Sequence, residues 1–158
     1  ALSSSSDDEF HRGALAAKAL ARAYAQVVAE LLAQAGVDAA AITAIGAHGQ
    51  TVRHRPQEFD GIGYTLQLNN PALLAELTGI DVVADFRTRD LAAGGQGAPL
   101  VPAFHQYFFG QRGTGVAVLN IGGVANLSLL SSAGSRAIAC ASGIMGFDCR
   151  PGNALHDT

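Results

Sequence analysis

Apolar residues recur with a helical period over the first part of the chain. The recurring positions, spaced three and four residues apart, are Ala14, Ala17, Ala21, Tyr24, Val28, Leu31 and Leu32. Serines at positions 3–6 and acidic residues at positions 7–9 precede this stretch, and Gly36 follows it. Serine and aspartate cap helix N-termini, acidic side chains favour the first turn, and glycine ends helices. The pattern predicts one amphipathic helix over residues 7–35.

Short apolar runs separated by polar segments follow the predicted helix. Residues 42–47 form one run, which ends at a polar segment over residues 48–50, and residues 65–68 and 81–86 form two more. Runs of this length are typical of buried strands. Residues 72–77 have a helical pattern that ends at a threonine-glycine pair. Strands separated by helices predict an α/β fold with a mainly parallel sheet.

A second apolar helix and a glycine-rich linker divide the predicted elements into two groups. Residues 100–109 form the helix, with Pro102 in its first turn, where proline is tolerated. The linker at residues 110–115 contains three glycines. Glycine-rich segments commonly mark domain boundaries, so we expect a partial first α/β domain over residues 1–112 and the start of a second domain over residues 113–158.

A glycine pair marks a hairpin in the second group. Residues 116–121 and 125–130 are rich in strand-forming side chains and flank Gly122 and Gly123. A tight turn between two such runs is typical of a β-hairpin. We expect a third strand near residues 136–141.

Composition limits the classes of function. The 158 residues are 49% hydrophobic, carry a formal charge of −3 and have a sequence pI of about 5.9. This balance supports a globular domain and argues against nucleic acid and anionic membranes as partners. Cys140 and Cys149 lack a metal-binding or redox spacing, so we expect reduced thiols in a cytoplasmic protein. The chain runs from Ala1 to Thr158, and we expect it to be a piece of a longer protein.

An aspartate close to the glycine hairpin is the first candidate for chemistry. Asp148 lies in the segment 146–157, which we expect to be a turn that opens a helix. Asn120 and Asn126 flank the glycine pair, and their amides can bind hydroxyl or phosphate oxygens beside exposed backbone N–H groups. This combination suggests an anion-binding site and phosphoryl transfer. The alternative is a plain tight turn.

Polar segments at the ends of the predicted strands are further candidates. Residues 85–90 and 48–51 each follow a strand, the usual place for ligand groups in an open α/β sheet. Taken alone, such segments are more often a surface ion-pair cluster and a polar turn, respectively. Residues 94–99 are glycine-rich but match neither common nucleotide-loop pattern. The histidines His48, His54, His105 and His156 lack the spacing of metal ligands, so we predict no metal site made by the protein alone.

Several strings together resemble the anhydro-N-acetylmuramic acid kinase family. They are HGQTVRHRP (48–56), TLQLNNP (65–71), VVADFRTRDLAAGGQGAPLVPAFH (82–105), LNIGGVANLSLL (119–130) and GFD–PGNAL–D (146–157). The resemblance runs from about residue 42 to the end of the chain. It implies an actin-like, ribonuclease H-like two-domain kinase fold, with the first domain nearly complete and the second truncated.

The resemblance also implies an activity. Members of the family use ATP and Mg²⁺ to open 1,6-anhydro-N-acetylmuramic acid with water and to phosphorylate the released O6, which gives N-acetylmuramic acid 6-phosphate in cell-wall recycling. The implied partners are the amino sugar and ATP, and the implied location is the cytoplasm. Whether the protein forms a homodimer is left undecided by the resemblance.

The resemblance assigns roles to individual residues. Asp148 would be the general base, and Gln50, Thr51 and Arg87, with Asn120, would hold the sugar. A guanidinium suits a carboxylate because its donors form a planar fork. For the phosphates of ATP, with Mg²⁺ bridging them, the implied contacts are Asn120, Gly122 and Gly123.

The chain departs from the family pattern at a few positions. Cys149 and Arg150 replace a threonine-glycine pair, His156 replaces an apolar residue, and Asn69 stands where a glycine is usual. The N-terminal phosphate loop and the C-terminal adenosine segment of the family are missing, so we expect the isolated chain to be inactive as a kinase.

Three alternatives to this kinase remain at this stage. The first is another sugar kinase or a phosphatase of the same superfamily. The second is a non-catalytic sugar-binding fragment. The third is a glycosidase that pairs Asp85 or Asp90 with Asp148, because paired carboxylates hydrolyse glycosides.

Overall fold

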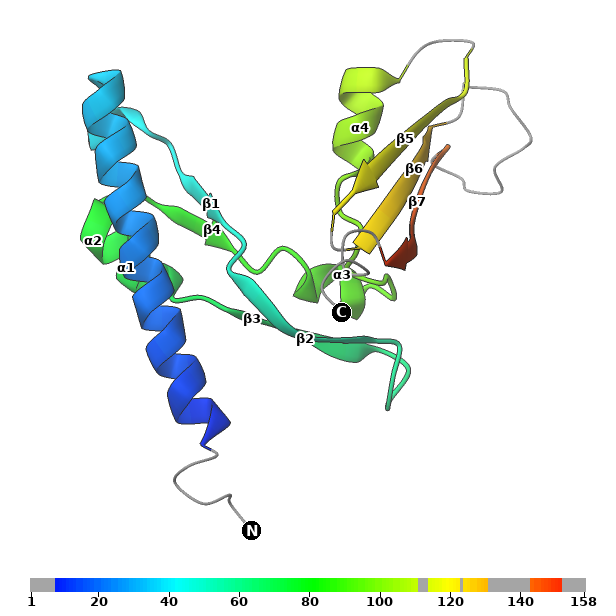
Figure 1. Cartoon of the computed structure of the whole chain (residues 1–158), viewed down its shortest axis with the longest axis horizontal. Helices are drawn as coiled ribbons and strands as arrows, with labels where there is room; N and C mark the ends of the chain where they lie inside the picture. The colour runs from blue at the N-terminus through cyan, green and yellow to red at the C-terminus, as the bar shows by residue number, and fades with distance from the viewer. Residues whose placement is uncertain (1–7, 111–113, 123, 131–142, 152–158) are drawn as a thin grey trace. The chain divides into compact units, whose positions relative to one another are not determined.

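The computed structural model describes residues 8–110, 114–122, 124–130 and 143–151 (Figure 1). The chain divides into two compact units between Gly95 and Gln96. The expected third strand near residues 136–141, and the helix expected to open after Asp148, lie outside the described residues. The sequence analysis expected a boundary between two domains at residue 112. This domain boundary is a different division from that between the two compact units, and it stays a prediction.

The first helix, α1 (Glu9–Ala35), confirms the helix that the sequence predicts. The Asp8 side chain accepts a hydrogen bond from the backbone N–H of His11 at 2.9 Å, and the helix ends at Gly36, which adopts the left-handed conformation. Both ends are therefore specified by local sequence, as capping aspartates and C-terminal glycines usually specify them. The face of α1 with Ala17 and Ala21 is buried.

The second helix, α2 (Pro71–Thr78), is also as predicted. Asn70 caps it by accepting from Leu73 N–H at 3.0 Å, and Gly79 ends it in the left-handed conformation. Leu74 is fully buried and packs with alanines of α1 and of the neighbouring strand. This cluster is the hydrophobic core of the first unit.

A short parallel pair lies next to this core. Strands β1 (Ile45–Ala47) and β4 (Val82–Ala84) pair in parallel, with Gly46 opposite Val83. They are shorter than the runs at 42–47 and 81–86, and a short 3-10 helix, η1 (Ala39–Ala41), precedes β1. Ala47, the last residue of β1, is buried in the core.

An antiparallel hairpin follows β1. Its second strand contains the predicted run at residues 65–68, whereas its first strand lies where the sequence analysis expected a polar segment. It consists of β2 (Gln50–Pro56) and β3 (Gly63–Leu68), with an irregularity between Thr51 and Arg53. The polar-turn interpretation of residues 48–51 was wrong for its second half, because an exposed hairpin strand can carry charged side chains and lack an apolar run. Asp60 lies in the loop between β2 and β3, and its carboxylate accepts hydrogen bonds from the N–H groups of Gly63 and Ile62. These hydrogen bonds lower the pKa of the Asp60 carboxyl.

The second unit is a helix packed on a three-stranded antiparallel sheet. Helix α4 (Pro102–Phe109) confirms the predicted helix, and its first residue is the expected proline. The sheet has the order β5-β6-β7, formed by β5 (Val116–Ile121), β6 (Val124–Leu130) and β7 (Ile144–Pro151). The first two strands are the predicted hairpin.

Helix α4 packs against β6 and β7. His105 Nδ1 lies 2.9 Å from Ser128 Oγ, and both residues are buried. Gly146 of β7 passes so close to Pro99 and Pro102 that a side chain at this position would collide with both prolines. The helix therefore covers the face of the sheet that carries Ser128.

Two sequence-based expectations are wrong. The sheets are not mainly parallel, because β1–β4 is the one parallel pair among the described strands and the other pairs are antiparallel. Asp148 lies within strand β7 rather than on a turn. Alternating apolar residues around it, Met145 and Phe147, were the available signal for a strand. Within the part of the chain that the structure describes, no helix is both long and apolar enough to cross a membrane.

Core packing around α2 gives the first test. We expect Leu74→Ala to lower the free energy of unfolding by about 2–5 kcal/mol, since it leaves a cavity in a fully buried site. Leu77→Ala is the matched control, because Leu77 lies on the same helix and is 50% exposed, and we expect it to cost less than about 1 kcal/mol. Urea unfolding of both variants measures the difference, and equal losses would contradict the assigned core.

Candidate functional site

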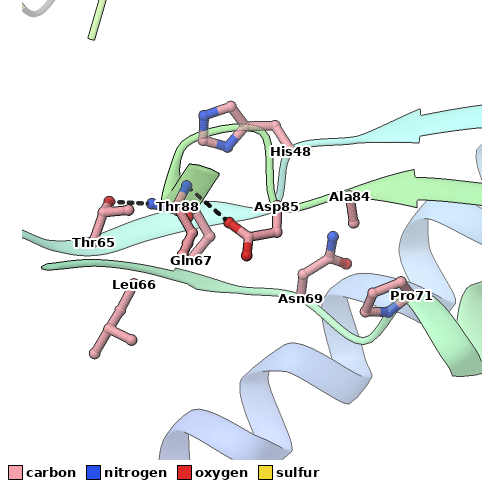
Figure 2. A pocket seen from close by; sticks show the side chains of 9 residues that line it. All are labelled: His48, Thr65, Leu66, Gln67, Asn69, Pro71, Ala84, Asp85 and Thr88. Atoms are coloured by element: carbon pink, nitrogen blue, oxygen red, sulfur yellow. Dashed lines mark hydrogen bonds between the residues drawn. The ribbon is translucent and has the colours of Figure 1, made fainter. Parts of the chain in front are cut away.

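A pocket of about 260 Å³ lies in the first unit (Figure 2). Its lining comes from the end of β1, from β3, from the start of α2 and from the turn after β4. The lining residues are His48, Thr65, Leu66, Gln67, Asn69, Pro71, Ala84, Asp85 and Thr88. Most of them carry hydrogen-bonding groups, so the pocket suits a small polar ligand.

The turn after β4 has an unusual backbone conformation. Asp85 has a φ of 57°, which is rare for a residue other than glycine. Its Oδ1 accepts a hydrogen bond at 3.2 Å from the N–H of Thr88, the first residue of the short helix α3 (Thr88–Ala92). Strained residues of this kind cluster at ligand sites. Arg87 lies between these two residues, and its Nε donates to Nε2 of His48 at 2.9 Å.

A row of polar side chains follows one face of the β2–β3 hairpin. Gln67 Nε2 donates to Thr65 Oγ1 at 2.7 Å and to Thr51 Oγ1 at 3.4 Å. His54 Nδ1 lies 3.1 Å from the same Thr65 hydroxyl. Thr65 is buried, and its hydroxyl is therefore held in place by several partners. The alternation of Thr65 and Gln67 along β3 was a signal for these two lining residues that the sequence analysis did not use.

The sequence-predicted sugar residues of this unit lie beside the pocket rather than in its lining. Arg87 and Thr51 each hydrogen-bond to a lining residue, His48 and Gln67 respectively. Gln50 is exposed, and its Nε2 donates to the carbonyl of its neighbour Thr51 at 3.2 Å. The structure therefore brings Arg87 and Thr51 within one hydrogen bond of the pocket, whereas Gln50 has no such contact among the described residues.

Two amide side chains and one carboxylate lie side by side on three neighbouring strands of the second unit. Asn120 of β5 lies opposite Asn126 of β6, and Asn126 lies opposite Asp148 of β7. Directly opposed residues of an antiparallel pair share one face, with Cβ atoms about 4.5–5.5 Å apart. The structure thus places the predicted base and the predicted phosphate-binding asparagine in one row. Gly122 follows β5 at the turn, and Gly123 lies outside the described residues.

An irregularity in β7 sets the register of this row. Ala125 pairs with Arg150 and Asn126 pairs with Asp148, so Cys149 is an extra residue in its strand. Such bulges redirect side chains and are common beside active sites. Asp148 and Asn120 are exposed, whereas Asn126 Oδ1 is buried and has no hydrogen-bond partner among the described residues. A buried unpaired acceptor needs an explanation, and a bound cation or donor is one.

The fold is that of an α/β protein, with a polar pocket in its first unit and a row of amide and carboxylate side chains in its second. The family model described as "Anhydro-N-acetylmuramic acid kinase" matches residues 1–158. The chain belongs to this family.

Curated relatives carry the same name. A protein of Variovorax paradoxus is 64% identical over 157 residues, which cover 99% of this chain and 41% of the relative. One of Albidiferax ferrireducens is 62% identical over 170 residues, which cover 100% and 44%, and one of Cupriavidus metallidurans is 60% identical over 157 residues, which cover 99% and 40%. The chain spans about two fifths of the length of these relatives.

The pocket depends on a close backbone approach at Gly49, and this approach can be tested. Gly49 has a φ of 77°, and a Cβ there would collide with the carbonyl oxygen of Leu68. We expect Gly49→Ala to destabilise the chain by the left-handed penalty of about 1–2 kcal/mol plus a packing penalty of about 1–3 kcal/mol. Gly36→Ala is the control, since Gly36 has a φ of 65° and no atom within 4 Å of its Cβ position. Thermal unfolding compares the two, and equal destabilisation would contradict the close approach.

Proposed function

We propose that this chain provides the sugar site and the catalytic base of a cytoplasmic kinase that acts on 1,6-anhydro-N-acetylmuramic acid in cell-wall recycling. In this reaction water opens the anhydro bridge and the γ-phosphate of ATP is transferred to O6, giving N-acetylmuramic acid 6-phosphate. The observation that carries the proposal is the row Asn120–Asn126–Asp148, which places a carboxylate beside two amides in a chain of this family.

The proposed role of Asp148 is to take a proton from the attacking water. As the water oxygen bonds to the anomeric carbon, the bond from that carbon to O6 breaks, and O6 becomes the acceptor of the phosphoryl group. A general base has to lie within about 2.6–3.2 Å of the proton that it removes. The side chain of Asp148 is exposed on its strand, so water reaches it directly.

The proposed phosphate contacts are Asn120, Gly122 and Gly123. Phosphoryl transfer depends mainly on positioning and on stabilising charge, for which amide and backbone donors are suited. The donor set near the row fits Mg²⁺, because this ion prefers oxygen ligands and usually binds one or two carboxylates together with phosphates and water. The Oδ1 of Asn126, which is buried and has no hydrogen-bond partner among the described residues, is such an oxygen. When bound, Mg²⁺ would neutralise charge on the phosphates.

The proposed sugar contacts are Arg87 and Thr51, together with Gln50 and Asn120. The pocket beside Arg87 is lined by amide, hydroxyl and carboxylate groups, which match the hydroxyl and acetamido groups of an amino sugar. Arg87 is the proposed partner of the sugar carboxylate, because a guanidinium binds a carboxylate through two parallel hydrogen bonds. That the fold is an actin-like two-domain arrangement, and that the protein forms a homodimer, stay predictions.

A chimera tests whether the chain supports this activity. In it, the 158 residues replace their 157-residue counterpart in the Variovorax paradoxus relative. We expect sugar-dependent release of ADP and formation of the 6-phosphate, identified by mass. Phosphate release without a phosphorylated sugar would support a phosphatase, and sugar hydrolysis without ATP would support a glycosidase.

Removing the proposed base should stop the reaction and spare binding. In the chimera, we expect Asp148→Asn to lower kcat by about 10²- to 10⁴-fold, because the amide keeps the size of the side chain and loses the basic oxygen. Sugar affinity, measured by calorimetry, should change little. Asp81→Asn is the control, because Asp81 is an exposed aspartate just before β4. A fully active Asp148→Asn variant would exclude Asp148 as the base.

Replacing the proposed carboxylate partner should weaken sugar binding selectively. We expect Arg87→Lys to raise KM for the sugar by about 10- to 100-fold, as the loss of a charge-assisted hydrogen bond does, and to leave KM for ATP nearly unchanged. Lysine keeps the charge but lacks the planar fork. Arg89→Lys, two residues further along α3, is the control. A fall in ATP affinity with unchanged sugar affinity would place Arg87 in the nucleotide site instead.

A further inference from the structure

The contact between His48 and Arg87 joins two segments that are 39 residues apart in the sequence. Arg87 Nε lies 2.9 Å from His48 Nε2, and His48 Nδ1 lies 3.1 Å from the carbonyl oxygen of Gly49. Arginine stays protonated and can only donate. His48 Nε2 therefore accepts, Nδ1 carries the proton, and the neutral Nδ1–H form of the imidazole is the one that satisfies both contacts.

We propose that His48 is a positioning residue that orients the guanidinium of Arg87 for the sugar carboxylate. This inference rests on the proposed function, in which Arg87 binds the sugar. The bond to Nε fixes the plane of the guanidinium and therefore the direction from which a carboxylate meets its two Nη atoms. An arginine side chain has several rotatable bonds, so fixing it before the ligand arrives reduces the entropy lost on binding.

The backbone on both sides of His48 is held by the end of β3. Asn69 Nδ2 donates to the carbonyl oxygen of Ala47 at 2.9 Å. Gly49 packs against the carbonyl of Leu68, where only glycine fits. The imidazole itself is half-buried and meets the ring of Phe86 edge-on, with ring centroids 6.4 Å apart. The histidine is thus a rigid acceptor, as a positioning residue has to be.

The backbone of Arg87 is held as well. The Asp85 carboxylate accepts a hydrogen bond from the N–H of Thr88, so Arg87, which lies between these two residues, has a defined place before α3. Both partners of the His48–Arg87 hydrogen bond therefore project from fixed segments. A side chain held at its base and at its Nε has little freedom left in the plane of its guanidinium.

The hydrogen bond has a spectroscopic signature that does not depend on sugar. In the ¹⁵N-labelled 158-residue chain, long-range ¹H–¹⁵N spectra distinguish the two tautomers of each histidine. We expect His48 to be the Nδ1–H form, with the Nε–H signal of Arg87 shifted in His48→Leu. His54, which bonds to Thr65 rather than to an arginine, is the internal reference, and His54→Leu should leave the Arg87 signal unchanged. An Nε2–H form of His48 would overturn the proposal.

Matched substitutions test the effect on the ligand. A glutamine amide oxygen reaches about as far as Nε2, whereas an asparagine oxygen reaches only as far as Nδ1. By calorimetry with 1,6-anhydro-N-acetylmuramic acid, we expect His48→Gln to retain most of the affinity and His48→Asn and His48→Leu to lose about tenfold, as the loss of one hydrogen bond does. Circular dichroism of each variant identifies unfolding, and His48→Gln keeps the test valid if His48→Leu does not fold.

The outcomes separate the two hypotheses. If His48→Gln and His48→Asn lose equal affinity for the sugar, and Arg87→Lys also binds the sugar more weakly, the positioning role of His48 is overturned. The proposal that Arg87 binds the sugar then still stands. A wild-type chain that shows the His48–Arg87 signature but binds no sugar overturns the proposed sugar site, and the role of His48 in it falls as well. Selective rescue by glutamine together with the Nδ1–H form supports the proposal.

Discussion

The close approach between the end of β1 and the end of β3 is the constraint on which the first unit depends. Asn69 donates to the Ala47 carbonyl, and Gly49 lies against Leu68 with no room for a side chain. Ala47 itself is buried in the core, whereas its neighbour His48 lines the pocket. One backbone junction therefore links the hydrophobic core to the ligand-binding groups, and a change in the junction has to disturb both.

The second unit depends on strand register in the same way. A single extra residue, Cys149, decides that Asp148 rather than its neighbour lies opposite Asn126. A shift of one residue would move the carboxylate to the other face of the sheet, because side chains alternate along a strand. Asn69 and Cys149 each take part in this geometry, the first through its hydrogen bond to the Ala47 carbonyl and the second as the extra residue of β7.

Local sequence predicted the helices α1, α2 and α4 well, missed the short helix α3 and predicted the strands less well. The ends of α1 and α2 follow from Asp8, Gly36, Asn70 and Gly79, because a cap acts on a backbone only a few residues away. Strand β2 was missed because its charged side chains lie on an exposed hairpin, and only pairing with β3 makes it a strand. Asp148 was expected on a turn for a related reason, since a strand at this position depends on β6.

Sequence alone determined the family, the acids, amides and arginine that carry the proposed chemistry, and the helices whose caps lie within a few residues. Tertiary structure decided which of these groups meet. The hydrogen bond from Arg87 to His48 spans 39 residues, and Asn126 and Asp148, which lie opposite each other, are 22 positions apart in the sequence. Neither follows from local pattern, because long-range pairing depends on the packing of whole elements, and the free energy of that packing is shared among residues distant in the sequence.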